Sequence, residues 1–204
     1  MKIILATTNS GKLKEFIELS KSEPWLDIEL APPDFAPEET GKTFFENARI
    51  KATTAATMTG VIAVADDSGL VVEALNGRPG VQSARYCEGT DADRRAKLLK
   101  EMENVKPGER QAAYFCAMVI SNSDGTVAFN TIRCWEGIIG YEEQGENGFG
   151  FDPVFFLPKK NMTAAQIAAE EKNRISHRGQ AWAQIIAHLK KVASTSPDQI
   201  GTQR

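Results

Sequence analysis

The sequence predicts a mixed α/β fold, in which a central twisted sheet carries helices on its faces and an active cleft lies between two lobes of one chain. Short apolar runs at 3–6 and 61–65 predict buried strands, and an amphipathic segment follows the first run and precedes the second. Two longer segments, 111–120 and 126–135, flank a run of turn-forming residues, which predicts a β-hairpin that extends the sheet.

Composition and charge exclude several classes of protein. The formal net charge of -3, without a basic segment, predicts no binding to a nucleic-acid polymer. No apolar run approaches the ~20 residues of a membrane span, and we expect no leader. Cys87, Cys116 and Cys134 show neither metal-ligand nor redox spacing, so we expect a cytoplasmic protein. We expect one domain over 1–193 and a disordered polar tail over 194–204.

The first strand leads into a polar turn, 7–12, and then into a helix. Asn9 or Ser10 can cap this helix, which leaves backbone N–H groups of its first turn free to bind an anion. Lys12 adds a positive charge. The segment therefore predicts a phosphate cradle without the Walker spacing, although an ordinary capped turn with a solvated lysine has the same residue types.

A proline-rich acidic loop covers 24–41 and includes one short strand at 27–30. Glu38 and Glu39 lie near the end of this loop, where acidic side chains are commonly solvated.

A capping box at 43–46 then opens a helix that we expect to run to Met58. Asn47 and Lys51 are four residues apart, so they project as neighbours from one face of that helix. They can reach a phosphate if this face lines the cleft, and are otherwise solvated.

Two adjacent carboxylates, Asp66 and Asp67, follow the second buried strand and precede Ser68. We expect the strand to end at Ala65 and a Ser-Gly turn to follow, which concentrates negative charge where a divalent cation can bind. Successive side chains of an extended chain point to opposite faces, so only one of the two carboxylates is expected to face the cleft. The alternative is a polar turn that merely closes the strand.

Turn formers at 76–80, a polar helix at 91–102 and a glycine-rich aromatic loop at 148–153 follow. A Phe beside glycines in this loop can stack on a nucleobase, but it can equally fill the core.

The last helix has Ser176 as its expected N-cap. His177 and Arg178 in its first turn oppose the helix dipole, which favours an anionic or electron-rich ligand nearby, unless both are simply exposed. Lys172 lies just upstream.

Six segments carry a more specific pattern: ATTNSGKLKE at 6–15, ETGKTFFENA at 39–48, ADDSGL at 65–70, GRPGVQSARY at 77–86, FGFDP at 149–153 and SHR at 176–178. In this order they resemble the inosine triphosphate pyrophosphatase family. The resemblance extends from about Ile3 to Leu189. It implies magnesium-dependent hydrolysis of non-canonical purine nucleoside triphosphates to the monophosphate and pyrophosphate, a homodimer, and a role in cleansing the nucleotide pool.

The resemblance also implies roles for individual residues. Asp67 would be the catalytic proton acceptor and a magnesium ligand, with Glu38 as the second metal acid, although the adjacent Glu39 remains an alternative. The residues implied to bind substrate are Thr7, Thr8, Asn9, Ser10, Gly11, Lys12, Lys51, Ser68, Phe149, Gly150, Phe151, Asp152, Lys172, His177 and Arg178. Phe151 departs from the family, which typically has Tyr or Trp there, so stacking is kept while a polar contact is lost.

Chemistry and composition agree with these implications. Hard oxygen ligands and substrate phosphates suit Mg²⁺, and no cysteine or histidine pair favours zinc. Two alternatives stay open. One is a pyrophosphatase for other nucleotides, and the other is a non-catalytic nucleotide-binding module, which would need Lys12 and Lys51 but not Asp67.

Overall fold

The computed structural model describes residues 1–195 and confirms the α/β class. Seven strands form one mixed sheet in the order β2-β1-β3-β4-β5-β6-β7. The strands are β1 (Lys2–Leu5), β2 (Asp27–Leu30), β3 (Ala63–Val72), β4 (Gln111–Ser121), β5 (Val127–Ile139), β6 (Phe155–Leu157) and β7 (Met162–Thr163). β1 is parallel to both β2 and β3, and every later pair is antiparallel.

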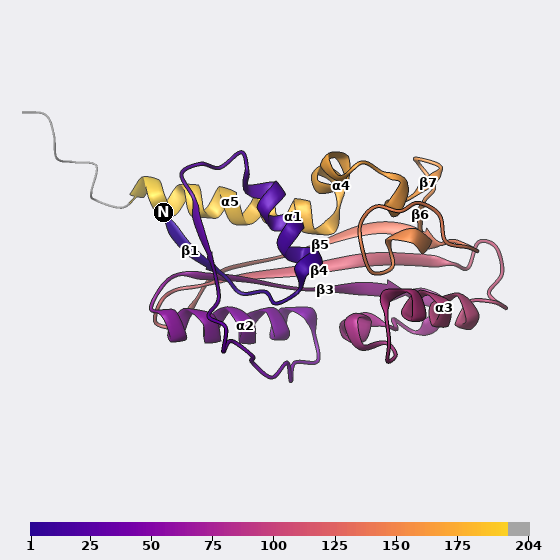
Figure 1. The fold of residues 1–204 in the computed structure, drawn as a ribbon, viewed down its shortest axis with the longest axis horizontal. Coiled ribbons are helices and arrows are strands. Elements are labelled where there is room, and N and C mark those ends of the chain that lie inside the picture. Colours follow the sequence, from indigo (N-terminus) through magenta and orange to yellow (C-terminus); the bar gives the residue numbers. More distant parts are fainter. Residues whose placement is uncertain (196–204) are drawn as a thin grey trace, which may run out of the picture.

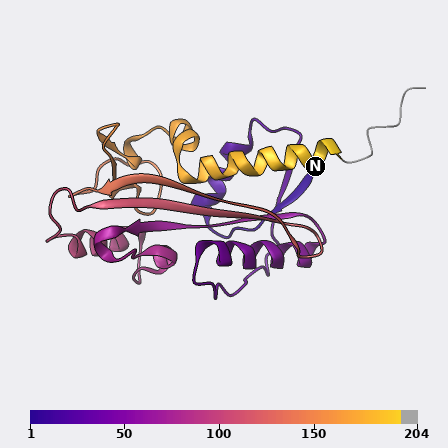
Figure 2. The same ribbon diagram turned by 180° about the vertical axis from the view of Figure 1, so that it is seen from behind.

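Helices cover both faces of this sheet (Figure 1). The α-helices are α1 (Ser10–Ser20), α2 (Phe44–Thr59), α3 (Asp91–Glu101), α4 (Ala169–Ile175) and α5 (His177–Thr195). Short 3₁₀ turns cover Glu73–Leu75, Gly80–Arg85, Asp152–Val154 and Ala164–Gln166. α1, α4 and α5 lie on one side, while α2 and α3 lie on the other, as the view from behind also shows (Figure 2).

Buried apolar side chains form three clusters, which produce the two expected lobes. At one end of the sheet, a cluster that includes Phe16 and Trp182 lies under α1 and α5, and a second that includes Ala52 lies under α2. The third cluster, which includes Leu98 and Phe155, fills the other end. A site between these two ends therefore lies between separately packed parts of the hydrophobic core.

Local sequence explains the helix ends that border the site. Asn9 caps α1 by accepting a hydrogen bond from the Lys12 N–H at 3.0 Å, which decides between the two expected caps. Thr43 and Glu46 form the expected capping box at α2. The Ser176 Oγ accepts from the Gly179 N–H at the start of α5, as expected.

The expected end of the second buried strand at Ala65 is wrong. β3 continues to Val72, because Asp66 through Val72 pair residue by residue with β4. Gly69 here allows a close approach rather than a turn, since a Cβ at this position would lie 2.4 Å from the Gly80 carbonyl oxygen. Among the described strands, β1 pairs with β3 only as far as Val64, so the following residues of β3 have a strand on one side only.

Several other segments differ in extent from the sequence expectation. The hairpin is confirmed, but β5 continues beyond Trp135 to Ile139. β6, β7 and α4 were not expected, because two to seven residues are too few to show a period. α5 includes 194–195, and the rest of the expected tail, 196–204, lies outside the described residues. Within 1–195, no helix is long and apolar enough to cross a membrane.

Arg110 joins the end of α3 to the outer strands and is 3% exposed. Its guanidinium donates to the backbone carbonyls of Met102, Ile139 and Gly140 at 2.7–2.8 Å. Arg110→Met should lower the free energy of unfolding by about 3 kcal/mol, because buried carbonyls lose a charged donor. Urea denaturation measures this change. Arg49→Met, on an exposed helix face, is the control, and an equal loss in both variants would contradict the interpretation.

Candidate active site

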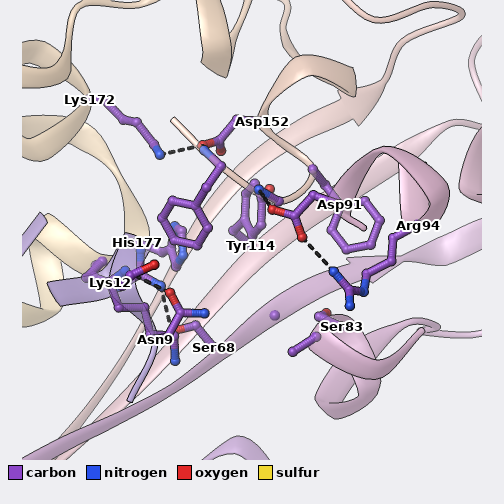
Figure 3. Close-up of a pocket in the computed structure, with 17 residues that line it drawn as sticks. Asn9, Lys12, Ser68, Ser83, Asp91, Arg94, Tyr114, Asp152, Lys172 and His177 are labelled. Carbon is purple, nitrogen blue, oxygen red and sulfur yellow. Dashed lines mark hydrogen bonds and ion pairs between the residues drawn. The ribbon is translucent and has the colours of Figure 1, made fainter. Parts of the chain in front are cut away.

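A pocket of about 330 Å³ opens between the two ends of the sheet. Its lining residues are Asn9, Ser10, Lys12, Ser68, Gly69, Ser83, Ala84, Asp91, Arg94, Tyr114, Phe149, Gly150, Phe151, Asp152, Lys172, His177 and Arg178. Figure 3 shows Asn9, Lys12 and Ser68 on one side and Asp91 and Arg94 on the other. The first turn of α1, β3, α3, the 148–153 loop and the start of α5 therefore meet at one place.

This lining contains most of the residues singled out from the sequence. Those it does not include are Thr7, Thr8, Gly11, Glu38, Glu39, Asn47, Lys51, Asp66 and Asp67. Thr7 and Gly11 adjoin the lining in the α1 turn, where the Thr7 Oγ1 accepts from the Asn9 N–H at 3.3 Å and Gly11 lies against Phe149. Asp67 and Lys51 lie together elsewhere, on the opposite face of β3.

Asp66 lies on the pocket side of β3 and is 1% exposed. Its carboxylate is 2.8 Å from the Lys12 Nζ and 3.6 Å from the Arg178 Nε, and it accepts a hydrogen bond from the Ser68 Oγ. Burial opposes ionisation, but Lys12 and Arg178 outweigh it and hold the pKa of Asp66 below its usual range. A buried anion thus fixes three polar side chains at the pocket, whereas the family resemblance implied a role for Asp67 and none for Asp66.

Asp67 points to the other face of β3, as strand alternation requires. Its carboxylate accepts from the Asn47 Nδ2 at 3.3 Å and lies 3.4 Å from the Lys51 Nζ. Burial raises the pKa of Asp67, and Lys51 only partly offsets this effect. Burial disfavours the charge on Lys51, yet Asp67, Asp66 and Glu39 outweigh burial and raise the pKa of Lys51. Asn47 and Lys51 therefore project as neighbours from α2, as expected, and both contact the Asp67 carboxylate.

The two acids of the 24–41 loop have different surroundings. The Glu39 Oε1 is 2.9 Å from the Lys51 Nζ, and its other oxygen is 3.6 Å from the Arg85 guanidinium. Glu38 is exposed. Glu39 and Asp67 thus share one lysine, which brings two carboxylates to the same small region.

A second buried network lies at the base of the pocket. The Lys172 Nζ contacts Glu15 at 2.7 Å and Asp152 at 2.6 Å, and the Arg178 guanidinium also contacts Glu15 at 2.5 Å. Burial would raise the pKa of Glu15, but Arg178 and Lys172 reverse the effect and lower it. Glu15, together with Asp152 at Lys172, therefore holds two buried cations in place.

The two phenylalanines of the 148–153 loop have different roles. The Phe149 ring lies against the start of α1, where a Cβ on Gly11 would approach it to 2.9 Å. The Lys172 Nζ and the Arg178 Cζ are 5.2 and 5.5 Å from its centroid, within cation–π range. Phe151 also lines the pocket, but it is 4% exposed and its ring packs edge-on against Tyr86 in the core.

His177 is buried, and its ring stacks on Tyr114 with centroids 4.7 Å apart. Burial lowers the pKa of His177 well below its ordinary value, and the neighbouring Arg178 and Lys172 lower it further. The His177 Nδ1 is buried without a hydrogen-bond partner in the described structure. A neutral imidazole with an unused polar atom therefore faces the pocket.

Sequence reasoning missed several residues of the site: Glu15, Ser83, Asp91, Arg94 and Tyr114. Glu15 is the last residue of the ATTNSGKLKE segment at 6–15, which resembles the family, so this segment could have identified Glu15 as a site residue. Tyr114 occupies an ordinary strand position and Asp91 an ordinary helix start, and nothing in a single sequence distinguishes such residues from structural ones.

The carboxylates present suit a hard divalent cation. Asp67 and Glu39 offer oxygen ligands only, which match Mg²⁺ and not a softer metal. Within 1–195, no group of three or more His, Cys, Asp or Glu side chains is arranged to hold an ion. A site with one or two carboxylates is typical of Mg²⁺ bound together with substrate phosphates.

Comparisons with known proteins agree with this geometry. A sequence model of the Ham1 family matches residues 3–188. A Listeria innocua protein named dITP/XTP pyrophosphatase is 45% identical over 198 residues, which cover 94% of this chain and 96% of that protein. One of the same name from Idiomarina loihiensis is 48% identical, with coverage of 93% and 98%. The solved structure of a HAM1 protein from Coxiella burnetii superposes with a TM-score of 0.83 at 41% identity, with coverage of 94% and 99%.

The pair of Lys12 and Asp66 can be tested by a double-variant cycle. Lys12→Met should lower the free energy of unfolding by roughly 2 to 3 kcal/mol, because the buried Asp66 carboxylate then keeps only one ion pair, the 3.6 Å contact with Arg178. Adding Asp66→Asn should recover part of that loss, since the unpaired charge is then removed. Urea denaturation of the four proteins measures the coupling. Strictly additive losses would contradict a buried ion pair.

Proposed function

The chain belongs to the Ham1 family, and from this premise we propose that it hydrolyses non-canonical purine nucleoside triphosphates, such as ITP, dITP and XTP, to the nucleoside monophosphate and pyrophosphate. The two relatives named dITP/XTP pyrophosphatase align with almost the whole chain, which supports carrying their activity over. Such a hydrolase removes these nucleotides from the pool.

The observation that carries the proposal is the division of charge across β3. One face presents Asp66 with Lys12, and the other presents Asp67 with Lys51. A triphosphate that crosses the unpaired edge of β3 can meet both lysines, with the first turn of α1 beside it. Ligands of open α/β sheets commonly bind beyond the carboxyl ends of parallel strands, and β1 and β3 provide such a place.

Phosphate binding falls to the start of α1 and to the two lysines. The first N–H groups of a helix have no intrahelical partners and favour an anion. Asn9 caps that turn. Lys12 adds a positive charge, and its contact with Asp66 fixes the orientation of the lysine side chain. Lys51 supplies a second cation on the other face. Positive charges held in place before the reaction stabilise the departing pyrophosphate without reorganisation.

We propose that Mg²⁺ is the cofactor, held by Asp67 and one acid of the 24–41 loop. The contact between Glu39 and Lys51 favours Glu39 over Glu38 as that acid. When bound, Mg²⁺ would neutralise charge on the phosphate oxygens during hydrolysis. Asp67 would also accept the proton of the attacking water.

Base selection is proposed to lie with Lys172, His177 and Arg178. An ammonium has three N–H groups, and two on Lys172 are occupied by Glu15 and Asp152, so one remains for a ligand. Inosine and xanthosine present an acceptor oxygen at the 6-position, whereas adenine presents a donor. A donor-lined site would leave buried groups unpaired against adenine, and such mismatches can discriminate by ~10⁴.

The proposal includes a single pyrophosphatase domain over 1–193 and a homodimer in the cytoplasm, without a nucleic-acid or membrane partner. The sequence resemblance supports the dimer. The cytoplasmic location rests on the sequence, in which Cys87, Cys116 and Cys134 show neither metal-ligand nor redox spacing.

A pyrophosphate-release assay tests the reaction and its specificity. With Mg²⁺, kcat/KM for ITP and XTP should exceed that for GTP, and GTP should equal or exceed ATP, because the 6-oxygen finds a donor. EDTA should abolish the release. Equal rates with ATP would contradict this account of specificity. Faster hydrolysis of modified pyrimidine or methylated purine triphosphates would favour another pyrophosphatase, and no release would favour a binding module.

Asp67→Asn should lower kcat at least ~100-fold while the fold stays intact, because a general base and a metal ligand are lost together. Steady-state pyrophosphate release measures kcat, and circular dichroism checks folding. Asp124→Asn, in the exposed β4–β5 turn, is the control. Activity of Asp67→Asn within tenfold of the unmodified protein would remove this residue from its role.

Glu39→Gln should raise the Mg²⁺ concentration needed for half-maximal activity about tenfold, because one anionic ligand is lost. Glu38→Gln changes the neighbouring acid in the same way and should have a smaller effect. A magnesium titration of both variants compares them directly. The opposite order would assign the second metal acid to Glu38.

A further inference from the structure

The N-terminal part of α3 is hydrogen-bonded to the glycine-rich loop that carries Phe149. The Asp91 Oδ2 accepts a hydrogen bond from the Gly150 N–H at 2.9 Å, and an Arg95 guanidinium N–H donates to the Gly150 carbonyl at 3.0 Å. The Arg95 Nε also lies 2.8 Å from the Glu143 carboxylate, earlier in the same connection. Both polar groups of one residue in the loop are thus held by one helix that lies more than fifty residues away in sequence.

This loop has little preference for one shape of its own. Gly148 and Gly150 have positive φ angles of 76° and 62°, and so does Gly145 just before the loop, at 84°. Glycine gives such conformations at an entropic cost, so the ordered form depends on contacts from outside the loop. Asp152 fixes one end by accepting from the Phe149 N–H and from Lys172. The middle of the loop is fixed by α3.

We propose that Asp91 and Arg95 are positioning residues for base recognition: the first turn of α3 holds the Gly150 peptide so that the neighbouring Phe149 ring stays in register with the start of α1. Asp91 touches both Gly150 and Arg94, and both Asp91 and Arg94 line the pocket. The inference rests on the proposed function, in which this pocket receives the purine base.

The consequence for substrate follows from how closely Phe149 approaches α1. A Cβ on Gly11 would lie 2.9 Å from the ring, so Phe149 has no room to move closer to α1, and a displaced loop would carry the ring away from it. Loss of these contacts should weaken substrate binding and base selection more than the chemical step, because Asp67 lies on the opposite face of β3, beside Asn47 and Lys51.

An ordinary structural role for Asp91 would be to stabilise the start of α3, where an acidic residue favours the helix dipole. Asp93 separates the two roles. It forms the capping box of α3 with Thr90, and its described hydrogen bonds stay within that first turn. Asp93→Ala therefore weakens the same helix end without removing a bond to the loop.

The test compares Asp91→Ala, Asp91→Asn and Asp93→Ala in the full chain. Asp91→Ala should raise KM for ITP about tenfold, leave kcat within about twofold, and reduce the preference for ITP over GTP. Asp91→Asn keeps an acceptor oxygen, so its KM for ITP should lie close to that of the unmodified protein. Asp93→Ala should lower the melting temperature but leave KM unchanged. An equal KM change in Asp93→Ala, or an unchanged KM in Asp91→Ala, would overturn the proposal.

Amide hydrogen exchange supplies a readout that does not need catalysis. Asp91→Ala should speed exchange at least fivefold in peptides covering 148–152, and Asp93→Ala should not. Unchanged exchange in Asp91→Ala would show that Asp91 does not hold the loop, whatever the activity of the variant. If the unmodified protein releases no pyrophosphate, the proposed function fails, and the exchange result still decides whether α3 holds the loop.

Discussion

Strand alternation in β3 is the constraint on which the rest of the site depends. Asp66 and Asp67 are adjacent in sequence, and an extended backbone sends their side chains to opposite faces of the sheet. Each carboxylate then meets its own lysine, Lys12 from α1 or Lys51 from α2. A turn at this point would have placed both acids in one exposed cluster, whereas the continuous strand gives each a separate environment and a separate pKa.

Buried charge around the pocket is balanced by protein groups, and this balance orders the side chains before a ligand binds. Glu15 holds Lys172 and Arg178, while Asp66 holds Lys12. Such pairs cost desolvation energy, so their value lies in fixed direction more than in stability. Cations that are already oriented can meet a polyanionic substrate with little reorganisation. The same arrangement makes single substitutions damaging, because each removed partner leaves a buried charge.

Much of the fold and part of the site could be predicted from sequence, and the differences have physical causes. The capping box of α2 and the alternation of Asp66 and Asp67 follow from local rules and are confirmed. The predicted end of this strand at Ala65 was wrong, because pairing with β4 overrode the turn propensity of Ser68-Gly69. The grip of Asp91 on the loop joins distant segments, and no local pattern encodes that contact. Site roles inferred from the family resemblance stay predictions.

We propose that the two faces of β3 have different functions, with metal binding on the Asp67 face and a fixed ion pair on the Asp66 face. The most direct test is Mn²⁺ binding, followed by electron paramagnetic resonance in the presence of a non-hydrolysable α,β-methylene analogue of dITP. Asp67→Asn should weaken Mn²⁺ binding at least tenfold, because a carboxylate ligand is lost. Asp66→Asn should leave it within about threefold. Equal losses, or a larger loss in Asp66→Asn, would contradict the account.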